Sequence, residues 1–599
     1  MLKRNESIAL SAANPFSDSK ASNYSDNRVV TEFCPVSKFW SLFNDQHEIL
    51  VGTRGCGKTL LLKMMRYSML NKLPDLKAKK LISEKKYIAF YVPLHLEYIK
   101  KLSNSNLSPD AKIAWFRFAF NCALAQSIII EITEMLNDLY DDDMDRIKTE
   151  YALTKLLDQC WTIDYSSPVF QLSKLREKVV KLFYNTDPIS EDLSNVPYTF
   201  NHSLGSSLSS ISHIICEKLN ISPTWIICVD EAEFIEENYQ KCINTAFRSD
   251  TDRIALKVAT LPFYHTTKST LDEKINVMDG HDFKYTIVDM KYDEPDFINV
   301  TNSLVRTRFQ NEDMNLEKVD DFLETVGSDN YIDYYSKEFG KEKSQRHYLE
   351  QEIFSQLSEN SKDHNSTKTS RQIKKSVIDK LAPIFYLREM YKKTKKGHNI
   401  PGWYAGATMV RRIAQGNPRI FIRIMNDLYN AAKGEKLPLR VKAQHKIIME
   451  FANSFCNETQ TLEQSGPMAK KHLEYISEII HKQTHNSTLR SCGVSFKLKD
   501  NTNLAQHKSW IERSVAFSRL MIDDKSLKTQ ITVDTIFQLA YVYAVSYWLP
   551  MRTHTSPLKI GIRDDVTSAY TIKRPKKGNT HSISGQLAIF NQGDTNYDY

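Results

Sequence analysis

The stretch VGTRGCGKTLLLKMM, from Val51 to Met65, decides the fold of this 599-residue chain. It carries the full GxxxxGK(S/T) spacing, in which glycines let the main chain wrap closely round phosphate groups and offer them its N–H groups. The helix that follows such a loop adds a field that favours negative charge. We therefore expect nucleotide phosphates to be bound by Gly52, Thr53, Arg54, Gly55, Cys56, Gly57, Lys58, Thr59 and Leu60.

The residues on both sides of the loop support this interpretation. HEILV, from His47 to Val51, is an apolar run suited to a buried strand, and TLLLKMMRYSML places apolar residues at helical spacing. The alternative is a glycine-rich turn that matches the spacing by chance, but such a turn would need neither a strand before it nor a helix after it. Lys58 is expected to reach the β and γ phosphates, and the Thr59 hydroxyl to ligate Mg²⁺. Cys56 lies among N–H donors that can activate a thiol, but a passive small residue is the favoured interpretation.

A second apolar run is expected to bring acids to the same place. TWIICVDEAEF, from Thr224 to Phe234, ends its apolar part in Asp230 and Glu231. In P-loop hydrolases the first acid of such a pair holds Mg²⁺, and the second orients and deprotonates the attacking water. We expect these roles here, so the sequence predicts hydrolysis in addition to binding. Glu233 can share the role of Glu231, although a surface position is favoured for it.

Three further runs complete a set of five candidate strands, namely YIAFYV (Tyr87 to Val92), IALKVAT (Ile254 to Thr260) and YTIVDM (Tyr285 to Met290). Strands that alternate with helices predict an α/β fold, with a parallel sheet covered on both faces and a ligand at the carboxyl ends of its strands. In P-loop ATPases of the AAA+ type, the strand beside the acidic one ends in a polar residue that senses the γ phosphate. Thr260 has that place, although a plain strand-ending threonine is almost as good an interpretation.

The segment QGNPRIFIRIMNDL, from Gln415 to Leu428, predicts a helix whose first turn faces a phosphate. Asn417 is a suitable N-cap, and Pro418 suits the first helical position. The apolar residues that follow recur at i, i+3, i+4 and i+7, so one face of the helix packs. Arg419 lies in the first turn and is expected to point to a phosphate, with a purely structural capping arginine as the alternative.

GNPR resembles the sensor 2 motif in the lid of origin-recognition-complex-like (ORC/CDC-type) AAA+ ATPases and of the related signalling STAND ATPases. With NPF (Asn14 to Phe16), the loop, the CVDEAEF strand and RSDTDRIALKVATLP (Arg248 to Pro262), the chain resembles the bacterial origin-recognition-like ATPases from about residue 14 to about residue 435, and more weakly to about residue 560. The resemblance implies ATP and Mg²⁺ as cofactors and a C-terminal winged-helix domain. Proteins of this kind often serve antiphage defence with a partner effector.

The arginine that AAA+ rings use across subunits is missing from its usual place. It usually lies shortly before the fifth strand, and residues Leu261 to Asp282 contain no arginine. Arg248 and Arg253 lie upstream, where local ion pairs are the favoured interpretation. A switch that binds ATP and hydrolyses it slowly is therefore favoured over a stable catalytic ring, and homo-oligomerisation stays open.

The predicted fold class is α/β, a P-loop AAA+ parallel sheet core with a helical lid, helical insertions and a C-terminal winged-helix-like domain. A long apolar helical stretch, from Ala114 to Leu139, lies within the insertion of the core. The expected parts are an N-terminal arm (1–46), the ATPase core (47–292) with a helical insertion at about 93–223, a helical lid with its own polar insertion (293–435), a winged-helix-like domain (436–560) and a polar tail (561–599).

Charge and composition indicate which kinds of partner the protein can bind. A net charge of +8 from 80 basic and 72 acidic residues is a mild excess, so DNA binding would depend on local clusters such as KKTKKGH (Lys392 to His398) and KRPKK (Lys573 to Lys577). The nine cysteines are scattered without metal-binding spacing, as expected in the cytoplasm. LAYVYAVSYWL (Leu539 to Leu549) is too short to span a bilayer and is expected to be a buried strand or short helix, so we predict no membrane partner.

Three functions therefore stay open. The favoured one is an ATP-dependent switch whose lid closes through Arg419, whose turnover depends on Glu231, and which acts with a protein partner or effector. The second is an initiator-like ATPase that binds DNA. The third is a scaffold that binds nucleotide without hydrolysing it.

Overall fold

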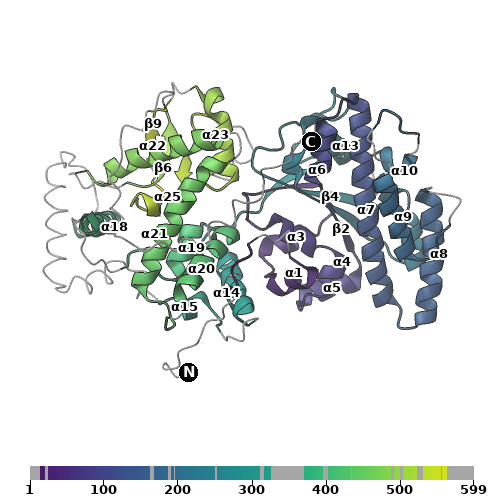
Figure 1. Ribbon diagram of the computed structural model, residues 1–599, viewed down its shortest axis with the longest axis horizontal. Helices are drawn as coiled ribbons and strands as arrows, with labels where there is room; N and C mark the ends of the chain where they lie inside the picture. Colours follow the sequence, from purple (N-terminus) through teal and green to yellow (C-terminus); the bar gives the residue numbers. More distant parts are fainter. Residues whose placement is uncertain are drawn as a thin grey trace, which may run out of the picture.

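The computed structural model describes residues 14–19, 24–161, 163, 168–185, 190–194, 196–249, 253–310, 316–324, 370–395, 402–433, 435–462, 465–486, 492–499, 503–522, 531–554 and 556–562. In Figure 1 these residues form two halves, with a sheet and a helical bundle on the right and a mainly helical part on the left. The helix of the phosphate loop, α3 (Lys58–Met64), lies where the halves meet. The KRPKK cluster, the polar tail and most of the predicted lid insertion lie outside the described residues.

A parallel sheet of five strands forms the core of the right half, in the order β2-β3-β4-β1-β5. This confirms the predicted α/β fold, and each candidate strand forms close to its expected position. The strands are β1 (Glu48–Val51), β2 (Tyr87–Pro93), β3 (Thr224–Asp230), β4 (Ile254–Thr260) and β5 (Lys284–Ile287).

The strand order brings the phosphate loop and the acidic pair to one edge of the sheet. β4 pairs with β1, where Val51 lies opposite Thr260, and with β3 on its other side. The phosphate loop leaves the carboxyl end of β1, and Asp230 is the last residue of β3. Both therefore reach the same edge, where ligands bind to parallel sheets, with one strand between them.

The strands are mainly apolar because both faces of the sheet are covered. Along β3, Ile226 and Cys228 join the hydrophobic cluster that also includes residues of α3, whereas Ile227 and Val229 join the cluster of the helical insertion. Since side chains alternate along a strand, Asp230 points to the same face as Ile226 and Cys228. The acid therefore lies on the side of the phosphate loop.

One ion pair is buried within the sheet. Lys257, in the middle of β4, is 0% exposed, and its Nζ lies 2.8 Å from Oε1 of Glu48 on the neighbouring strand. The register places the two residues opposite each other. Burial lowers the pKa of the Lys257 ammonium, and the Glu48 carboxylate opposes this shift. A lysine can interrupt the apolar run IALKVAT because this partner satisfies its charge.

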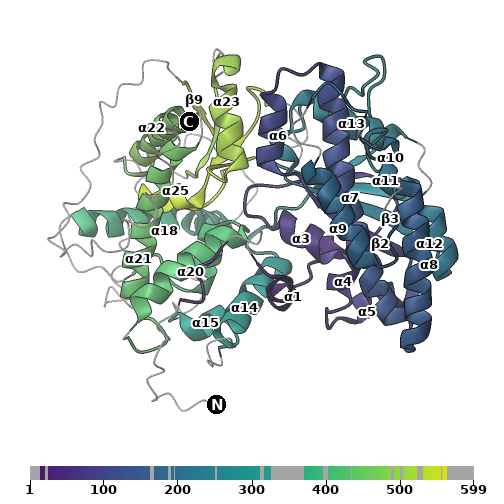
Figure 2. The ribbon, with the colours of Figure 1, turned by 45° about the vertical axis from the view of Figure 1, so that its right-hand side comes forward.

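A bundle of helices fills the insertion between β2 and β3. Its helices are α6 (Leu96–Ser103), α7 (Pro109–Leu139), α8 (Asp143–Trp161), α9 (Leu172–Asn185), α10 (Tyr198–Asn201), α11 (Ser206–Ser209) and α12 (Ser212–Leu219). Figures 1 and 2 show α7 next to the sheet and α8 at the outer edge of the molecule.

The helix α7 contains the long apolar stretch that the sequence shows within the insertion. Among the described residues it is the one helix long and apolar enough, by length and composition, to cross a membrane, with a mean hydropathy of 1.5 over an 18-residue window. Within the fold, 61% of that window is buried. The core helix of a soluble protein passes the same test, because its neighbours within the fold replace the lipid.

The remaining helices of the right half surround α3 and the sheet. They are α1 (Asp26–Glu32), α2 (Ser37–Ser41), α4 (Tyr67–Leu70), α5 (Leu76–Glu84), η2 (Ala232–Phe234) and α13 (Glu237–Arg248).

The left half holds the predicted lid and the C-terminal part. Its helices are α14 (Pro295–Gln310), α15 (Val319–Phe322), α18 (Ser370–Lys395), α19 (Ala407–Ala414), α20 (Pro418–Ala432), α21 (Val441–Glu458), η3 (Thr459–Thr461), α22 (Gly466–Thr484), α23 (Leu504–Ala516) and α25 (Tyr541–Ser546).

Four short strands form a second sheet in the order β7-β8-β6-β9, with β6 (Ser495–Leu498), β7 (Leu520–Ile522), β8 (Phe537–Leu539) and β9 (Leu558–Ile560). LAYVYAVSYWL supplies the end of β8 and then α25, so it is neither one strand nor one helix. The domain boundaries given above stay predictions.

The N-terminal arm is fixed to the lid by a buried arginine. Arg308, on α14, is 1% exposed, and its Nη2 lies 2.8 Å from Oε2 of Glu32. The same guanidinium donates to the Tyr24 hydroxyl and to the carbonyl oxygens of Pro15 and Asp18. One side chain of the lid thus organises a segment that lies almost 300 residues earlier in the sequence.

We expect Arg308→Met to destabilise the protein strongly, because Oε2 of the buried Glu32 carboxylate loses its charged partner and only Oε1 stays paired, with Arg28. Breaking one side of a buried pair costs about 3–5 kcal/mol. The matched control is Arg306→Met on the same helix, whose pair with Glu317 is exposed at both side chains and so contributes little. Thermal unfolding followed by circular dichroism would show a lower midpoint for the Arg308 variant only. Equal midpoints for the two variants would contradict the role of Arg308.

Candidate nucleotide-binding site

The phosphate loop has the backbone that its glycines predict. Gly55 and Gly57 adopt φ angles of 94° and 106°, in a region where other residues are strained. The Lys58 ammonium donates to Gly52 O at 2.7 Å and to Thr53 O at 3.3 Å, so the side chain lies along the loop. The first turn of α3 directly follows the loop, which leaves N–H groups available to an anion.

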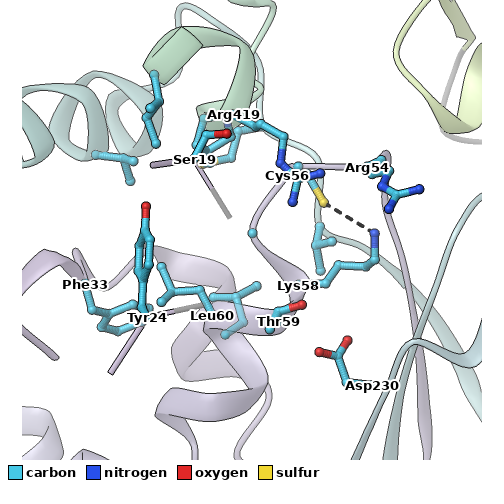
Figure 3. Close-up of a pocket in the computed structure, with 18 of the residues that line it drawn as sticks. Ser19, Tyr24, Phe33, Arg54, Cys56, Lys58, Thr59, Leu60, Asp230 and Arg419 are labelled. Atoms are coloured by element: carbon cyan, nitrogen blue, oxygen red, sulfur yellow. Dashed lines mark hydrogen bonds between the residues drawn. The ribbon is translucent and has the colours of Figure 1, made fainter. Parts of the chain in front are cut away.

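The thiol within the loop is a packing group. Cys56 is buried, and its Sγ lies 4.0 Å from Nζ of Lys58, the contact drawn as a dashed line in Figure 3. Burial raises the pKa of the Cys56 thiol to about 11, with Lys58 opposing the shift. The thiol therefore stays protonated at neutral pH, which agrees with the passive role favoured from the sequence.

The lid helix α20 holds the outer side of the loop. Asn417 caps this helix as predicted, since its Oδ1 accepts from Arg419 N at 3.0 Å. The Nδ2 of the same asparagine donates to Arg54 O at 3.0 Å, and Arg419 N lies 3.4 Å from Gly55 O. The N-terminus of the lid helix is thus bonded to the main chain at the apex of the loop.

The C-terminal part reaches the same apex. Arg54 N donates to Ala516 O at 2.8 Å, and the Arg54 guanidinium lies 5.2 Å from the centre of the Phe517 ring. Ser518 Oγ also accepts from Asn417 Nδ2 at 3.1 Å. The phosphate loop, the lid and the end of α23 therefore meet at one tight turn. No sequence pattern predicted this contact, because Ala516 to Ser518 match no motif.

The acidic pair lies across the cavity from the loop. Asp230 is buried at the end of β3, and its Oδ1 accepts from Glu231 N at 3.0 Å. Glu231 adopts φ 63° and ψ 33°, a left-handed conformation that costs a residue with a side chain about 1–2 kcal/mol. Burial, followed by the charge of Asp230, raises the pKa of the Glu231 carboxyl. Strain and burial of this kind concentrate at functional sites.

Two charged side chains that line the cavity have buried atoms without a hydrogen-bond partner in the protein. These atoms are Glu233 Oε2 and Arg419 Nε. Burial raises the pKa of Glu233, whereas burial and then the charge of Arg54 lower that of Arg419. The expected surface position of Glu233 is wrong, because its side chain is half-buried in the cavity lining and its Oε2 is buried. Buried polar atoms without partners favour a polar ligand at this place.

One cavity of about 310 Å³ joins these elements. It is lined by residues of the phosphate loop, by Asp230, Glu231 and Glu233, by Arg419 from the lid, and by the N-terminal arm. Figure 3 shows Arg54, Lys58, Thr59 and Asp230 toward one end, and Tyr24, Phe33 and Leu60 toward the other. The Thr59 hydroxyl and the Asp230 carboxylate supply the oxygen ligands that Mg²⁺ prefers. The donor set and the glycine cradle therefore fit a Mg²⁺–nucleotide.

Two of the predicted loop residues lie behind the cavity and outside its lining. Gly52 and Thr53 do not line it, whereas the residues from Arg54 to Leu60 do. Thr53 is held by Asp289, whose Oδ1 accepts from the Thr53 hydroxyl at 2.7 Å and whose Oδ2 accepts from Thr53 N at 3.0 Å. Burial raises the pKa of the Asp289 carboxyl. Asp289 was not among the predicted site residues, although an acid within the apolar run YTIVDM was a signal.

Thr260 ends β4 where the sequence placed it, between the loop strand and the acidic strand. Gly52 N lies 3.4 Å from Thr260 O, so the main chain touches the start of the loop. The buried hydroxyl has no hydrogen-bond partner and lines a small neighbouring cavity of about 10 Å³, away from the larger one. A role as γ-phosphate sensor stays a prediction.

The two arginines considered as fingers make local contacts. Arg248 Nη1 lies 3.1 Å from Oδ1 of Asp282, and Arg253 donates to Ser222 O at 3.2 Å. Neither residue lines the 310 Å³ cavity of its own chain. These contacts agree with the local role favoured from the sequence.

Comparison with known protein families gives one match. The family model described as ORC-CDC6-like matches residues 14–560, which span most of the chain. No curated protein sequence matches.

We expect Gly55→Ala to separate the lid helix from the loop. A Cβ at this position would lie 2.6 Å from Cβ of Arg419 and 2.9 Å from Oδ1 of Asn417. Gly57→Ala is the matched control, since it also requires a strained φ, but its Cβ would meet no atom within 4 Å. Hydrogen–deuterium exchange in the first turn of α20 should become at least about tenfold faster in Gly55→Ala only. Equal exchange in the two variants would contradict the contact.

Proposed function

The chain belongs to the ORC-CDC6-like family, and on this premise we propose that it is an ATP-binding and ATP-hydrolysing molecular switch. One observation carries the proposal: the phosphate loop, the acidic pair Asp230 and Glu231, and Arg419 of the lid line a single cavity. These groups come from three separate segments, and each has a chemical role in phosphoryl transfer to water.

The two ends of the cavity suit the two ends of ATP. Lys58 and Arg419 supply positive charge beside the glycine cradle, which favours the triphosphate there. The opposite end is formed by aromatic and apolar side chains, among them Tyr24 and Phe33, which suit a purine ring. The nucleotide would therefore lie between the loop and the N-terminal arm.

Hydrolysis is assigned to the acidic pair. Asp230 and the Thr59 hydroxyl would hold Mg²⁺, which when bound neutralises charge on the phosphate oxygens. Glu231 would orient a water and take its proton, and the burial that raises its pKa strengthens it as a base. Lys58 would bind the β and γ phosphates, and Arg419 would bind the γ phosphate from the lid. Thr260 is proposed as a sensor acting through its contact with the loop.

The switch would be read by the parts that hold the apex of the loop. Asn417 of the lid and Ala516 of the C-terminal part bond to Arg54, next to the cradle. A change in the loop on hydrolysis therefore reaches both parts directly. The resemblance to bacterial origin-recognition-like ATPases supports a setting in antiphage defence. There, in the cytoplasm, a protein partner or effector would respond to this change in the loop. Plaque assays with and without the neighbouring gene would test that setting.

Two substitutions separate binding from turnover. Lys58→Ala should weaken ATP binding about 10- to 100-fold, because a charge-assisted contact with the phosphates is lost. Glu231→Gln should bind ATP as the unmodified protein does and lower kcat by about 10²–10⁴-fold, the usual contribution of a general base. Binding of a fluorescent ATP analogue and release of phosphate measure the two effects.

The control for charge is Glu237→Gln, an exposed residue in the first turn of α13, which should change neither quantity. Normal turnover in Lys58→Ala would overturn the assignment of the site. ATP binding without any phosphate release by the unmodified protein would instead favour the scaffold.

An initiator-like DNA-binding function is the second candidate, and basic residues on the second sheet favour it. Lys497 on β6 lies opposite Lys559 on β9, and Lys499 directly follows β6, with its N–H donating to Ile560 O at 3.0 Å. A winged-helix domain, as inferred from the resemblance, could bring such a face to the phosphate backbone. The basic cluster at the end of α18, Lys392 to Lys395, is a further candidate.

If this function holds, the protein binds duplex DNA of random sequence at low salt. Changing Lys497, Lys499 and Lys559 to glutamine should then weaken binding and reduce the slope of log affinity against log salt by roughly one for each lysine that contacts a phosphate. The control replaces Lys77, Lys79 and Lys80 on α5. Absence of binding by the unmodified protein at low salt rules out this candidate.

A further inference from the structure

A tyrosine outside the cavity lining holds the acid that would bind the metal. Tyr91 lies on β2, and its hydroxyl donates to Oδ2 of Asp230 at 2.8 Å. The other oxygen of the same carboxylate, Oδ1, accepts from Glu231 N at 3.0 Å. Both carboxylate oxygens are thus bonded by neighbouring groups, which fixes the plane of the Asp230 side chain.

Tyr91 can only donate in this contact, because a carboxylate oxygen is an acceptor. On the other side of the ring, Nζ of Lys63 lies 5.9 Å from the ring centre. Lys63 belongs to α3, the helix of the phosphate loop. The ring of Tyr91 therefore lies next to both elements of the candidate site.

The helical insertion fixes the backbone of this tyrosine. β2 is the outer strand of the sheet, so part of its main chain has no neighbouring strand to bond. Tyr91 N donates instead to Oγ of Ser127 on α7 at 2.9 Å. A few residues further along α7, the Glu131 carboxylate accepts from Ser68 N at 2.7 Å and so binds the segment that follows α3. α7 therefore bonds both to β2 at Tyr91 and to the segment that follows α3.

We propose that Tyr91 is a positioning residue that sets the Asp230 carboxylate for Mg²⁺, and that Ser127 of the insertion helix α7 sets Tyr91. This inference rests on the proposed ATPase function and extends it, because it connects the insertion to the metal-binding acid. Tyr91 fixes one rotamer of Asp230 and leaves Thr59 and Lys58 untouched. Its loss would therefore weaken the contribution of Mg²⁺ to nucleotide binding and leave metal-free binding unchanged.

The test compares Tyr91→Phe with Tyr87→Phe. Tyr87 opens the same strand, at the end away from Asp230, so its change removes a hydroxyl of the same kind elsewhere. Affinity for a fluorescent ATP analogue is measured in Mg²⁺ and in EDTA.

For Tyr91→Phe we expect unchanged affinity in EDTA. We expect the gain in affinity on adding Mg²⁺ to be about tenfold smaller, as for loss of a hydrogen bond to a charged group. In turnover assays the half-saturating Mg²⁺ concentration should rise. Tyr87→Phe should match the unmodified protein throughout.

Ser127→Ala is the second variant, and it tests the connection to the insertion. It should reduce the gain from Mg²⁺ in the same direction and by less, because the Tyr91 hydroxyl is kept. An unchanged gain from Mg²⁺ in Tyr91→Phe overturns the proposal, and so does an equal loss of affinity in Mg²⁺ and EDTA. Failure of the proposed function looks different, because the unmodified protein would then release no phosphate while the binding readout would still report on Tyr91.

Discussion

The main chain at Arg54 and Gly55 bonds to two other parts of the protein while its inner side forms a phosphate cradle. The carbonyls of these residues accept from Asn417 and from Arg419 N, and Arg54 N donates to Ala516 O. Each peptide group is a rigid plane. When the N–H groups that face the cavity change direction, the carbonyl and N–H groups that bond to the lid and to the C-terminal part must therefore turn as well. The position of the lid and of the C-terminal part is thus tied to the state of one short turn.

The lid is held a second time, at the opposite end of the cavity. The Arg308 guanidinium binds the N-terminal arm through Glu32 and Tyr24, and Asn14 donates to Asn426 on the lid helix α20. Aromatic packing of Phe16 against Phe309 adds an apolar contact between the same segments. The cavity therefore lies between two fixed ends, and the arm that would contact the base of a nucleotide is bonded to the lid that would contact its phosphates.

The helical insertion forms a third connection, on the side of the acids. Tyr91 and Ser127 connect α7 to Asp230, and Arg66 lies between Asp26 of the N-terminal arm and Glu131 of α7. The insertion is thus bonded to the elements around the site. Its outer helix α8 carries exposed apolar side chains, including Met144 and Ile147. Figure 1 shows this helix at the edge of the molecule, on the far side of α7 from the phosphate loop.

The sequence by itself determined the elements whose chemistry is local. The glycine spacing before Lys58, the apolar run before Asp230 and the Asn417–Pro418 helix start each follow from neighbouring residues, because turns, strands and caps are short-range structures. The parallel sheet followed from the alternation of these elements. Only the tertiary structure decided that Glu233 lines the cavity, that Asp289 holds Thr53, that Tyr91 holds Asp230 and that Ala516 bonds to the phosphate loop. Such contacts join residues that are distant in sequence, and they carry no pattern of their own because each depends on strand order and helix packing.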